Sequence, residues 1–451
     1  MYNAIITKLG PIRPFGVDPQ TGKLKADKLQ LCTCWGNQII VGLNDKENDW
    51  GIYFPTDGSL SEDFAIKNDL VRRKDADGKP AGGMFDENRR IRTQKFRGEV
   101  SDGFWCPIKL LEQVVSPVDI YDDFVLIGGK KFQHGDEFSS INDVVICQKY
   151  ITQKTRSAGS HNSVKANKRT KSKMFKEHFD TAQLGANLHK IPLDALVIIH
   201  EKNHGTSQRF GNVLVMRKLP WYEKVLQKLK VKIQEWKWIC LNGTRRVVID
   251  PDRKLYHTYD FREAAIKPFK DNLRKGETIY FEVVGWENEN TTIMPIADNK
   301  KMNDKEFLKQ YGDKTIFAYG CTPGTFDVFI YRITMTNEDG FSYDLMWDDV
   351  VKRANELGVH HVKELDRFII RDRFGVINKD DRDIQEAFLQ YIEKLVEGPS
   401  SIDPSHIKEG VCVRVENDLQ NLKIYKYKSV AFKILEGLIK DTGVADMEES
   451  A

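Results

Sequence analysis

Lys202 is the residue whose type and setting point most directly to chemistry. It follows the strand-like segment ALVIIH and Glu201, and it opens the tetrapeptide Lys202-Asn203-His204-Gly205. A lysine amine is a poor nucleophile at its ordinary pKa of about 10.4, but burial or a neighbouring cation lowers the pKa and frees the lone pair. A lysine at a strand end beside a glycine-containing turn therefore predicts an exposed nucleophile; the alternative is an ordinary surface lysine.

Two carboxylates and a lysine pair lie on later strand-like segments. Glu282 lies in YFEVVG, Glu409 opens EGVCVR, and Lys426 and Lys428 form a Lys-x-Lys pair. Residues two apart on a strand point to the same side, so both ammonium groups can grip one anion. Carboxylates can orient a hydrated divalent metal on a phosphate, while lysines, and Arg245 after the segment NGT, neutralise its charge. Together these residues predict a phosphate-handling site.

The elements that must position these residues follow a mixed pattern of strands and helices from Met174 onward. The alternation of apolar and polar residues predicts strands at ALVIIHEK, NVLVM, EWKWICL, RRVVI, TIYFEVVGW, TIFAYG, DVFIYRITM, VCVRVEN and LKIYKYKSV. The 3.6-residue period predicts helices at LMWDDVVKRANELG, at DIQEAFLQYIEKLVEG and over 221–232, the last with Val225, Leu226 and Leu229 on one apolar face.

Residues 1–150 have a different pattern, in which short apolar runs alternate with turn residues. Such spacing is typical of a small β-barrel or sandwich. A run rich in Ser, Asn and Lys follows at 151–175, which we interpret as a flexible basic linker that either contacts phosphates or is only a solvated connector. The end of the chain, 437–451, reads as a loose acidic tail.

Composition excludes several classes of protein. The 69 basic and 66 acidic residues give a net charge of +3, which argues against a histone-like tail or a polyacidic chain, and a hydrophobic fraction of 40% argues against bulk disorder. The seven cysteines are an odd number without paired metal spacing, and Cys32 and Cys34 read as neighbours on a strand. No long apolar segment or leader is apparent, so we expect a soluble cytoplasmic protein that does not enter a membrane.

The motifs in their order resemble a known superfamily. Lys202 to Gly205 looks like motif I of the covalent nucleotidyltransferases, and its histidine in place of the more usual aspartate is similar to the RNA ligase 2 branch. The segments YFEVVG, DVFIY, EGVCVR and KYK resemble motifs III, IIIa, IV and V. The likeness spans residues 176–436 and implies an adenylyltransferase domain of antiparallel sheets with helices, similar to an ATP-grasp fold.

The first 150 residues carry a second resemblance. The segments LQLCTCWGNQIIVG, WGIYFPTD and KFRGEVSDGF look like the N-terminal OB module of certain ATP-dependent RNA ligases, apart from a long insertion at 71–88. The resemblances together imply an α+β chain with an OB-like nucleic-acid-binding domain over 1–150, the linker, the ligase domain and the tail. Trp35, Phe96 and Trp105 are candidates for base stacking in the OB-like domain, with a place in the core as the alternative.

The resemblance implies ATP-dependent RNA ligation for RNA repair. Lys202 would take AMP from ATP as a lysyl-AMP phosphoramidate and pass it to an RNA 5′-phosphate, where a 3′-hydroxyl would displace it. Glu201 would contact the adenosine, Arg245 a sugar or phosphate, and Phe329 the adenine ring, if Phe329 is not simply a core residue. Glu282 and Glu409 would bind the ribose or the waters of a Mg²⁺ or Mn²⁺ ion, and Lys426 and Lys428 the α-phosphate.

His204 and Gly205 complete the nucleotide site that the resemblance implies. A histidine cannot act as an anionic anchor for metal waters, so we expect His204 to hydrogen-bond a phosphate or water. The partners implied are RNA or RNA-DNA hybrid ends, with a nicked duplex preferred, and the protein is expected to act as a monomer.

Three alternatives remain. A catalytically inactive RNA-end-binding protein could keep the fold, although every key position holds a competent residue type. DNA ligases and mRNA capping enzymes share the lysine chemistry, but they carry an OB domain after motif V. Too few residues follow Lys428 for a domain of about 50 residues, so we expect none there.

Overall fold

The chain forms two compact units. The computed structural model describes residues 2–16, 26, 28–56, 58–74, 80–96, 99–150, 174–179, 181–216, 219–245, 247–249, 260–302, 304–375 and 381–438. Unit 1 consists of Met1–Ile151 and Lys433–Leu438, and unit 2 of Thr152–Phe432 and Ile439–Ala451. Nearly all of the predicted basic linker and most of the predicted acidic tail lie outside the described residues.

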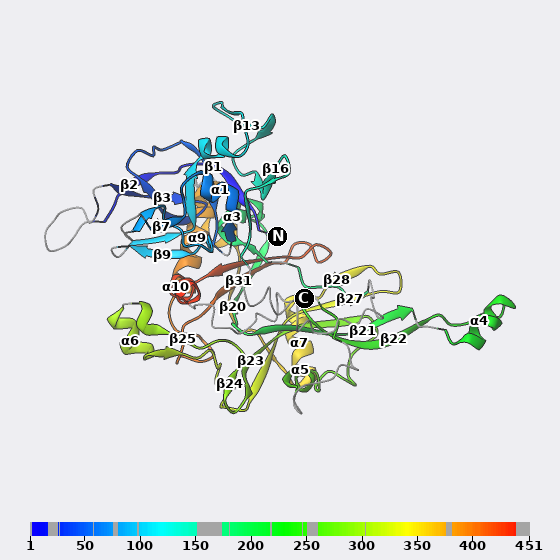
Figure 1. The fold of residues 1–451 in the computed structure, drawn as a ribbon. Helices are drawn as coiled ribbons and strands as arrows, with labels where there is room; N and C mark the ends of the chain where they lie inside the picture. Colours follow the sequence, from blue (N-terminus) through cyan, green and yellow to red (C-terminus); the bar gives the residue numbers. More distant parts are fainter. Residues whose placement is uncertain are drawn as a thin grey trace. The chain divides into compact units, whose positions relative to one another are not determined.

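Unit 1 is built from short strands around one apolar core. Its largest sheet has the order β11-β5-β1-β15 and a second has the order β2-β3-β4 (Figure 1). Its strands are β1 (Ala4–Lys8), β2 (Ile12–Pro14), β3 (Leu29–Cys34), β4 (Asn37–Gly42), β5 (Trp50–Phe54), β6 (Gly58–Leu60), β7 (Arg72–Lys74), β8 (Pro80–Gly82), β9 (Thr93–Phe96), β10 (Glu99–Asp102), β11 (Phe104–Pro107), β12 (Val118–Ile120), β13 (Val125–Ile127), β14 (Lys130–Phe132), β15 (Glu137–Phe138), β16 (Ser140–Ile141), β17 (Val144–Val145) and β18 (Cys147–Lys149). Its short helices are α1 (Glu62–Lys67) and η1 (Ile108–Gln113).

The described strands of unit 1 form several separate sheets of two to four strands and no closed barrel. The all-β character expected for 1–150 is therefore present, while the OB-like barrel stays a prediction. Trp105 is buried against β5, where a Cβ on Gly51 would lie 2.3 Å from its ring, so this tryptophan belongs to the core. Phe96 is 44% exposed, and Trp35 stacks on His134 with ring centroids 4.7 Å apart.

Unit 2 contains two larger sheets. A five-stranded sheet has the order β19-β32-β31-β20-β30, and a seven-stranded sheet contains the path β22-β21-β23-β27-β28, with β24 and β29 paired to its inner strands. The strands are β19 (Ala182–Gln183), β20 (Leu196–Lys202), β21 (Thr206–Met216), β22 (Trp236–Thr244), β23 (Glu277–Asn288), β24 (Thr291–Thr292), β25 (Ala297–Asp298), β26 (Lys314–Thr315), β27 (Phe326–Thr336), β28 (Ser342–Asp344), β29 (His360–His361), β30 (Glu364–Ile369), β31 (Gly410–Val415) and β32 (Lys423–Lys428).

Unit 2 also contains helices, most of them short. They are α3 (Leu184–Asn187), η2 (Leu188–Lys190), α4 (Trp221–Lys228), α5 (Phe261–Ala265), η3 (Asn299–Met302), α6 (Lys305–Tyr311), α7 (Trp347–Leu357), α8 (Ile370–Phe374), α9 (Asp381–Val396) and α10 (Val430–Leu438), the last of which continues into unit 1. Helix α9 packs Phe388 and Ile392 against Val411 and Val413 of β31, because its apolar residues recur at helical spacing on one face. Helix α9 therefore packs on the five-stranded sheet and stabilises it.

The predicted mixed α/β pattern is confirmed for unit 2, with three differences. Residues 316–320 are not a strand, since β26 ends at Thr315. In the segment RRVVI, Val248 forms only an isolated bridge with Gly243. Helix α4 ends at Lys228 rather than at residue 232, because Lys230 adopts a φ of +63°, which a right-handed helix does not allow. No helix in the described ranges is long and apolar enough to cross a membrane.

Candidate active site

The tetrapeptide that begins with Lys202 connects the two sheets of unit 2. Strand β20 ends at Lys202 in the five-stranded sheet, and β21 begins at Thr206 in the seven-stranded sheet. Lys202 lies opposite Gly410 of β31, which lies opposite Lys428 of β32. Residues paired across neighbouring strands project to the same side. The fold therefore brings Lys202 and Lys428 to one face, although 226 positions separate them in the numbering.

Glu409 is the centre of this cluster. Its Oε1 atom lies 2.8 Å from the Lys202 ammonium and 3.8 Å from the Lys428 ammonium, and its Oε2 atom lies 3.5 Å from Nδ1 of His204. The Glu409 side chain is 4% exposed, whereas that of Lys202 is 25% exposed. A buried carboxylate thus holds the reactive lysine at a point that solvent, or a ligand, can still reach.

The charges in the cluster shift the protonation of its members. Burial lowers the pKa of Lys202, but Glu409, helped by Cys412 and Glu282, outweighs burial and raises that pKa to about 12. Burial raises the pKa of Glu409, but Lys202, His204 and Lys428 outweigh it and hold that pKa well below its ordinary value. The resting site is therefore a lysine ammonium paired with a carboxylate. Burial raises the pKa of the neighbouring Cys412 thiol to about 11, which disfavours it as a competing nucleophile at neutral pH.

His204 lies between aromatic rings beside Glu409. Its ring meets Phe317 and Phe432 edge to face, with centroids 4.8 Å apart in each case. Its backbone N–H donates to the Tyr319 hydroxyl oxygen at 2.6 Å. The imidazole is thus oriented toward the Glu409 carboxylate, and a hydrogen bond from His204 to a phosphate or water remains a prediction.

Glu201, predicted to contact adenosine, is 1% exposed and bonded to a distant loop. Its carboxylate accepts hydrogen bonds from the Ser400 hydroxyl at 2.5 Å, from the Ser401 backbone N–H at 2.8 Å and from the Ser401 hydroxyl. These three donors fix the Glu201 carboxylate, which directly precedes Lys202 in the chain. The contacts therefore hold the end of β20 in position. Contact with a nucleotide stays a proposal.

Glu282 and Phe329 belong to the other sheet. Glu282 of β23 lies opposite both Ser207 of β21 and Phe329 of β27. A Cβ on Gly205 would lie 2.8 Å from Cγ of Glu282, so the motif turn packs directly on this carboxylate strand. Phe329 is only 6% exposed, and its ring stacks on His360 with centroids 5.6 Å apart. The structure therefore brings Glu282 to the Lys202 turn and places Phe329 in a buried position.

Lys426 and Arg245 lie further from the central carboxylate. Lys426 faces Cys412 on β31, two residues before Lys428 on the same strand. Arg245 follows the end of β22 and donates to the Phe179 carbonyl oxygen at 3.5 Å, while its own carbonyl oxygen accepts from Arg209 at 2.9 Å. These contacts anchor Arg245 to the segment before β19, and its contact with a sugar or phosphate remains a prediction.

Sequence reasoning missed several residues of the site. Tyr319 contacts the motif turn from a segment expected to be a strand, and its φ of +51° gave no sequence signal. Asn203 is 4% exposed, and neither atom of its amide has a hydrogen-bond partner among the described residues. An unsatisfied buried amide is costly, so a ligand or water is expected to bind it. The sequence signal that could have identified Asn203 was its position inside the tetrapeptide Lys202-Asn203-His204-Gly205.

The carboxylates fit a hydrated divalent cation. Glu409 Oε2 is buried and lies 3.5 Å from Nδ1 of His204, which leaves it short of the several hydrogen bonds that a carboxylate oxygen normally accepts. A water bound to Mg²⁺ or Mn²⁺ could satisfy this oxygen, because both metals prefer oxygen ligands. No group of three or more metal-binding side chains occurs in the described parts of the chain.

Replacing Gly205 by alanine is expected to disturb the turn that positions Lys202. The added Cβ would lie 2.4 Å from the Val283 carbonyl oxygen, so β21 and β23 must separate or the turn must shift. A displacement of about 1 Å at a reacting group costs roughly 10²-fold in rate. We expect Gly205→Ala to lower covalent labelling by ATP about 10²-fold, measured against Gly42→Ala, where no positive φ strains an alanine and the added Cβ meets only the Asp45 carboxylate, at 3.2 Å. Equal labelling of both variants would show that the close approach at Gly205 is not needed.

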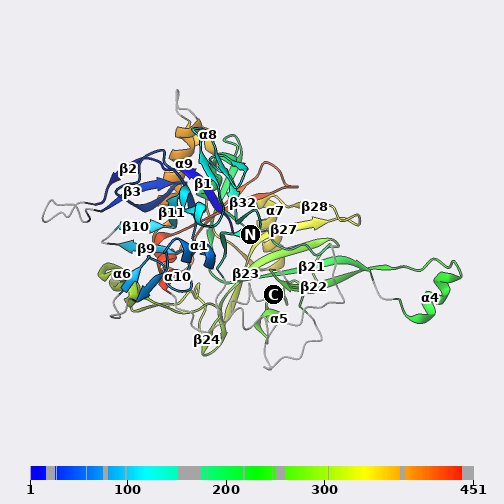
Figure 2. The same ribbon diagram turned by 45° about the horizontal axis from the view of Figure 1, so that its top comes forward.

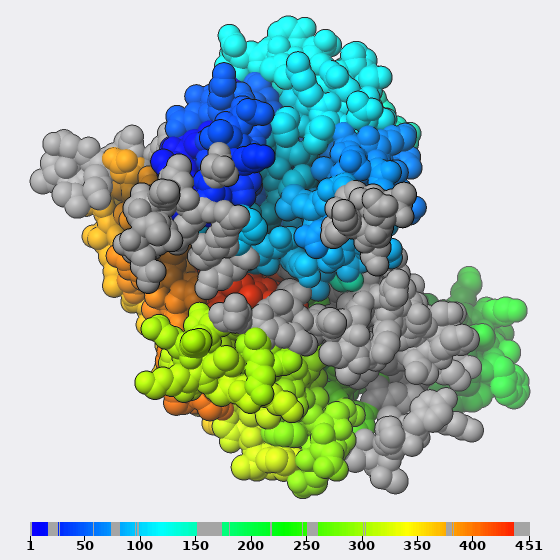
Figure 3. Space-filling model, turned by 60° about the vertical axis from the view of Figure 1, so that its left-hand side comes forward, coloured from blue at the N-terminus to red at the C-terminus, as the bar shows by residue number. Residues whose placement is uncertain are grey.

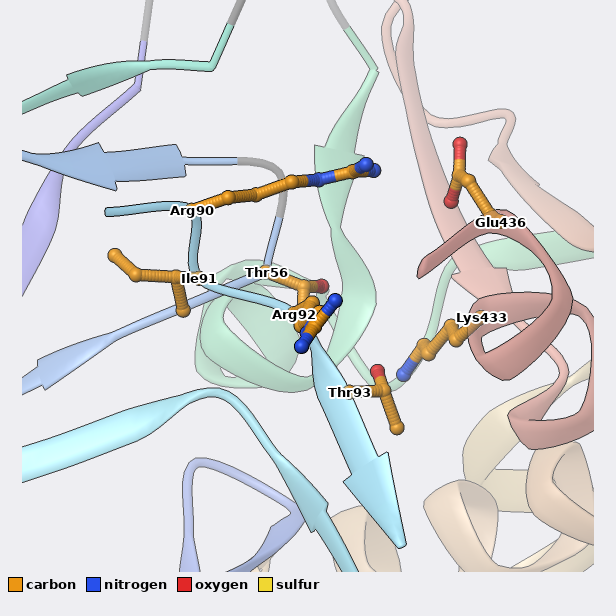
Figure 4. A pocket seen from close by; sticks show the side chains of 7 residues that line it. All are labelled: Thr56, Arg90, Ile91, Arg92, Thr93, Lys433 and Glu436. Atoms are coloured by element: carbon orange, nitrogen blue, oxygen red, sulfur yellow. The ribbon is translucent and has the colours of Figure 1, made fainter. Parts of the chain in front are cut away.

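A second polar pocket lies in unit 1. Thr56, Arg90, Ile91, Arg92, Thr93, Lys433 and Glu436 line it. In Figure 4 the charged ends of Arg90, Lys433 and Glu436 extend into the space between the β9 side and α10, with Arg92 beside them. Lys433 is paired with the buried Asp102, which also accepts a hydrogen bond from Thr93 at 2.6 Å. This pocket is a basic site separate from the lysine cluster of unit 2.

Comparisons with solved structures identify proteins of the same fold. The chain is similar to Naegleria gruberi RNA ligase: a point mutant with AMP and Mn aligns at a TM-score of 0.56 and 15% identity, covering 96% of this chain and 98% of that one. The structure with PPi aligns at 0.55 and 15%, with the same coverage. An apo point mutant aligns at 0.55 and 14%, covering 96% and 97%. This chain has the fold of an RNA ligase.

This likeness confirms the expected RNA ligase nucleotidyltransferase fold, while the OB-like module and the RNA ligase 2 branch stay predictions. No family model matches the chain, and no curated protein matches it. At 14–15% identity the likeness concerns the fold, so the reaction must be argued from the residues of the site.

Proposed function

We propose that this protein is an ATP-dependent RNA ligase that seals 3′-hydroxyl and 5′-phosphate ends through a lysyl-AMP intermediate. The observation that carries the proposal is the ion pair between Lys202 and the buried Glu409 at 2.8 Å, with Lys428 beside it. A solvent-reachable lysine held by a carboxylate and flanked by a second cation suits attack on a phosphate. The fold shared with an RNA ligase supports the same reaction.

The proposed reaction has three steps. The Lys202 amine, after losing a proton, forms a bond from Nζ to the α-phosphorus of ATP, and the bond from that phosphorus to pyrophosphate breaks. The AMP then moves to an RNA 5′-phosphate, which frees the lysine and leaves a 5′-to-5′ pyrophosphate linkage on the RNA. A 3′-hydroxyl finally attacks the RNA phosphorus, forms the phosphodiester bond and releases AMP.

Several residues are proposed to hold the nucleotide. Lys426 and Lys428 would contact the α-phosphate. Lys428 lies opposite Gly410 of β31, which in turn lies opposite Lys202, and Lys426 projects from the same side of β32 as Lys428. Arg245 would contact a sugar or another phosphate, while Phe329 would adjoin the adenine and Glu201 the adenosine. His204, Gly205 and Asn203 form the turn beneath the phosphates.

A divalent cation is part of the proposal. Mg²⁺ or Mn²⁺, bound through waters by Glu282 and Glu409, would supply neutralisation of the phosphate charge. The Naegleria RNA ligase structures include complexes with ATP and Mn, which supports this choice of cofactors. The carboxylates also serve this chain directly, because Glu409 orients Lys202 and His204 whether or not the ion is bound.

Unit 1 is proposed to be an OB-like module that binds the RNA. Its pocket carries Arg90 and Arg92, and the exposed ion pair of Arg92 with Asp86, at 3.2 Å, is weak enough to open for a phosphate. We expect Arg90→Ala/Arg92→Ala to weaken binding of a nicked RNA duplex roughly tenfold and to reduce its salt dependence, with labelling by ATP unchanged. Filter binding at several salt concentrations measures this. Unchanged RNA affinity would remove the pocket from the RNA path.

Two assays test the proposed function. Wild-type protein with ATP labelled at the α-phosphate and Mg²⁺ or Mn²⁺ is expected to become covalently labelled, and then to join nicked duplex RNA faster than DNA-splinted or single-stranded ends. Absence of label with both metals would favour an inactive RNA-end-binding protein. Labelling with joining of DNA alone, or transfer to a diphosphate RNA end, would instead indicate a DNA ligase or a capping-type enzyme. A cytoplasmic monomer acting in RNA repair is part of the same proposal.

A further inference from the structure

The hairpin of β21 and β22 ends in an unusually exposed apolar surface. The two strands pair from Gln208 with Thr244 as far as Met216 with Trp236, and α4 lies between them in sequence. In Figures 1 and 2 this hairpin carries α4 away from the rest of unit 2, and in Figure 3 the green tip projects at the right-hand edge. We call residues 219–236 the arm tip.

The apolar residues of the arm tip form one continuous face. Successive residues of a helix point about 100° apart, so Trp221, Tyr222, Val225, Leu226 and the following Leu229 fall within an arc of about 140°. None of the eight residues of α4 is buried, and Trp221 and Leu229 are 78% and 69% exposed. Val231 and Trp236 extend the exposed set. Contiguous exposed apolar surface on a soluble domain marks an interaction site.

The arm tip is held in shape without an apolar core of its own. Leu229 donates to the carbonyl oxygens of Val225 and Leu226, and Val231 donates to Leu226, which closes the end of the helix. The Gln227 side chain is hydrogen-bonded to Glu235 near the start of β22. An isolated helix of two turns is marginal in water. These local bonds therefore hold the helix in a conformation whose apolar face is left uncovered.

Charge and helix length select the kind of partner. The arm tip contains four lysines and two glutamates, a net charge of +2. Two such surfaces repel each other, which disfavours a second copy of this chain. The binding of a helix to a membrane surface strengthens with the apolar area that the helix buries, and the eight residues of α4 offer little such area. RNA-binding platforms use aromatic rings and cations, whereas Val225, Leu226, Leu229 and Val231 are aliphatic.

We propose that the arm tip docks into an apolar groove with an acidic rim on another protein. The apolar face would enter the groove, with Trp221 and Leu226 as anchors, and Lys224 and Lys228 would meet the acidic rim. The proposal does not depend on the function proposed for Lys202. It predicts that loss of docking leaves covalent labelling by ATP unchanged.

Site-specific crosslinking followed by reconstitution tests the docking. The full chain, with a benzophenone amino acid in place of Tyr222, is irradiated in extract of its source organism, and the crosslinked protein is purified and titrated against the wild-type chain. Trp221→Ser/Leu226→Ser is expected to weaken binding at least tenfold, and Lys224→Glu/Lys228→Glu to weaken it at low salt. The control Phe341→Ser, which changes a 74% exposed residue on another loop, is expected to bind as wild type.

Each other outcome overturns the proposal. Adducts between copies of the chain would indicate self-association. Binding to vesicles of 70% phosphatidylcholine and 30% phosphatidylserine that Trp221→Ser/Leu226→Ser abolishes would indicate a membrane surface. Loss of affinity for a 20-nucleotide RNA in the same variant would assign the arm to RNA. The absence of any adduct would show that the apolar face of the arm tip has no specific partner. The same conclusion would follow if the purified crosslinked proteins bound wild type and Trp221→Ser/Leu226→Ser equally.

Discussion

Lys202→Ala protein is expected to take up no label from ATP labelled at the α-phosphate. The expected loss is roughly 10⁴-fold or more, because no neighbouring group replaces the nucleophile. Lys428 lies in the same cluster, but its side chain is 9% exposed, its ammonium lies 5.3 Å from the Phe432 ring centroid, and it comes from a different strand. Burial also keeps the Cys412 thiol protonated near neutral pH, since its pKa is raised to about 11.

Controls make the loss specific to the nucleophile. Lys309→Ala removes an exposed lysine of α6 and is expected to label as wild type. Lys202→Arg keeps a positive charge beside Glu409 but supplies no amine that loses its proton, so it should fold normally and remain unlabelled. Joining of RNA that already carries a 5′-adenylate should survive in part, since that substrate bypasses the first two steps. Label on Lys202→Ala protein would place the nucleophile elsewhere.

The local parts of the site could be predicted from the sequence, because they depend on short patterns. The alternation in ALVIIHEK and VCVRVEN correctly predicted β20 and β31, and the tetrapeptide at Lys202 indicated the turn at the end of β20. The order β32-β31-β20 could not be predicted in the same way, because these strands are distant in the chain and their pairing depends on the whole sheet. The contact of Lys202 with Glu409 was thus a hypothesis until the sheet order was known.

Other features of the site depend on contacts that leave no periodic signal. Ser400 and Ser401 bind Glu201 from a loop 199 and 200 positions away, and serines in loops are too common to mark such a role. For α4 the helical period was correct, but the period alone does not say what covers the apolar face. Burial is a tertiary property, so an apolar face predicted at Val225 and Leu226 proved to be exposed.

Glu409→Gln is expected to lower covalent labelling about 10²- to 10³-fold at neutral pH, a loss similar in size to that from removing one preorganised hydrogen-bonding group from an active site. The neutral amide keeps the shape of the side chain but removes the charge shared with Lys202, His204 and Lys428. Metal binding through waters would weaken as well. The control Asp313→Asn changes a carboxylate in an exposed pair with Lys300 and should label normally.

The pH dependence separates the effect on Lys202 from the effect on the metal. In wild type the pKa of Lys202 is raised to about 12, so only the small neutral fraction can attack, and kcat/KM should rise about tenfold per pH unit across pH 6–9. Without the Glu409 charge, burial and the neighbouring Lys428 both favour the neutral amine, and the pKa of Lys202 falls. The kcat/KM of Glu409→Gln should therefore stop rising at a lower pH than that of wild type. Its maximal value should still be smaller than the wild-type value.

The direction of this shift distinguishes two roles of Glu409. If Glu409 acted solely through the metal, the variant profile would be parallel to that of wild type, and extra Mn²⁺ would restore the rate. If the ion pair sets the protonation of Lys202, the levelling point moves to lower pH at every metal concentration. Measuring kcat/KM for label uptake from pH 6 to 10 at two Mn²⁺ concentrations decides between these results. A parallel profile would contradict the assignment of Glu409 as the residue that keeps Lys202 charged before ATP binds.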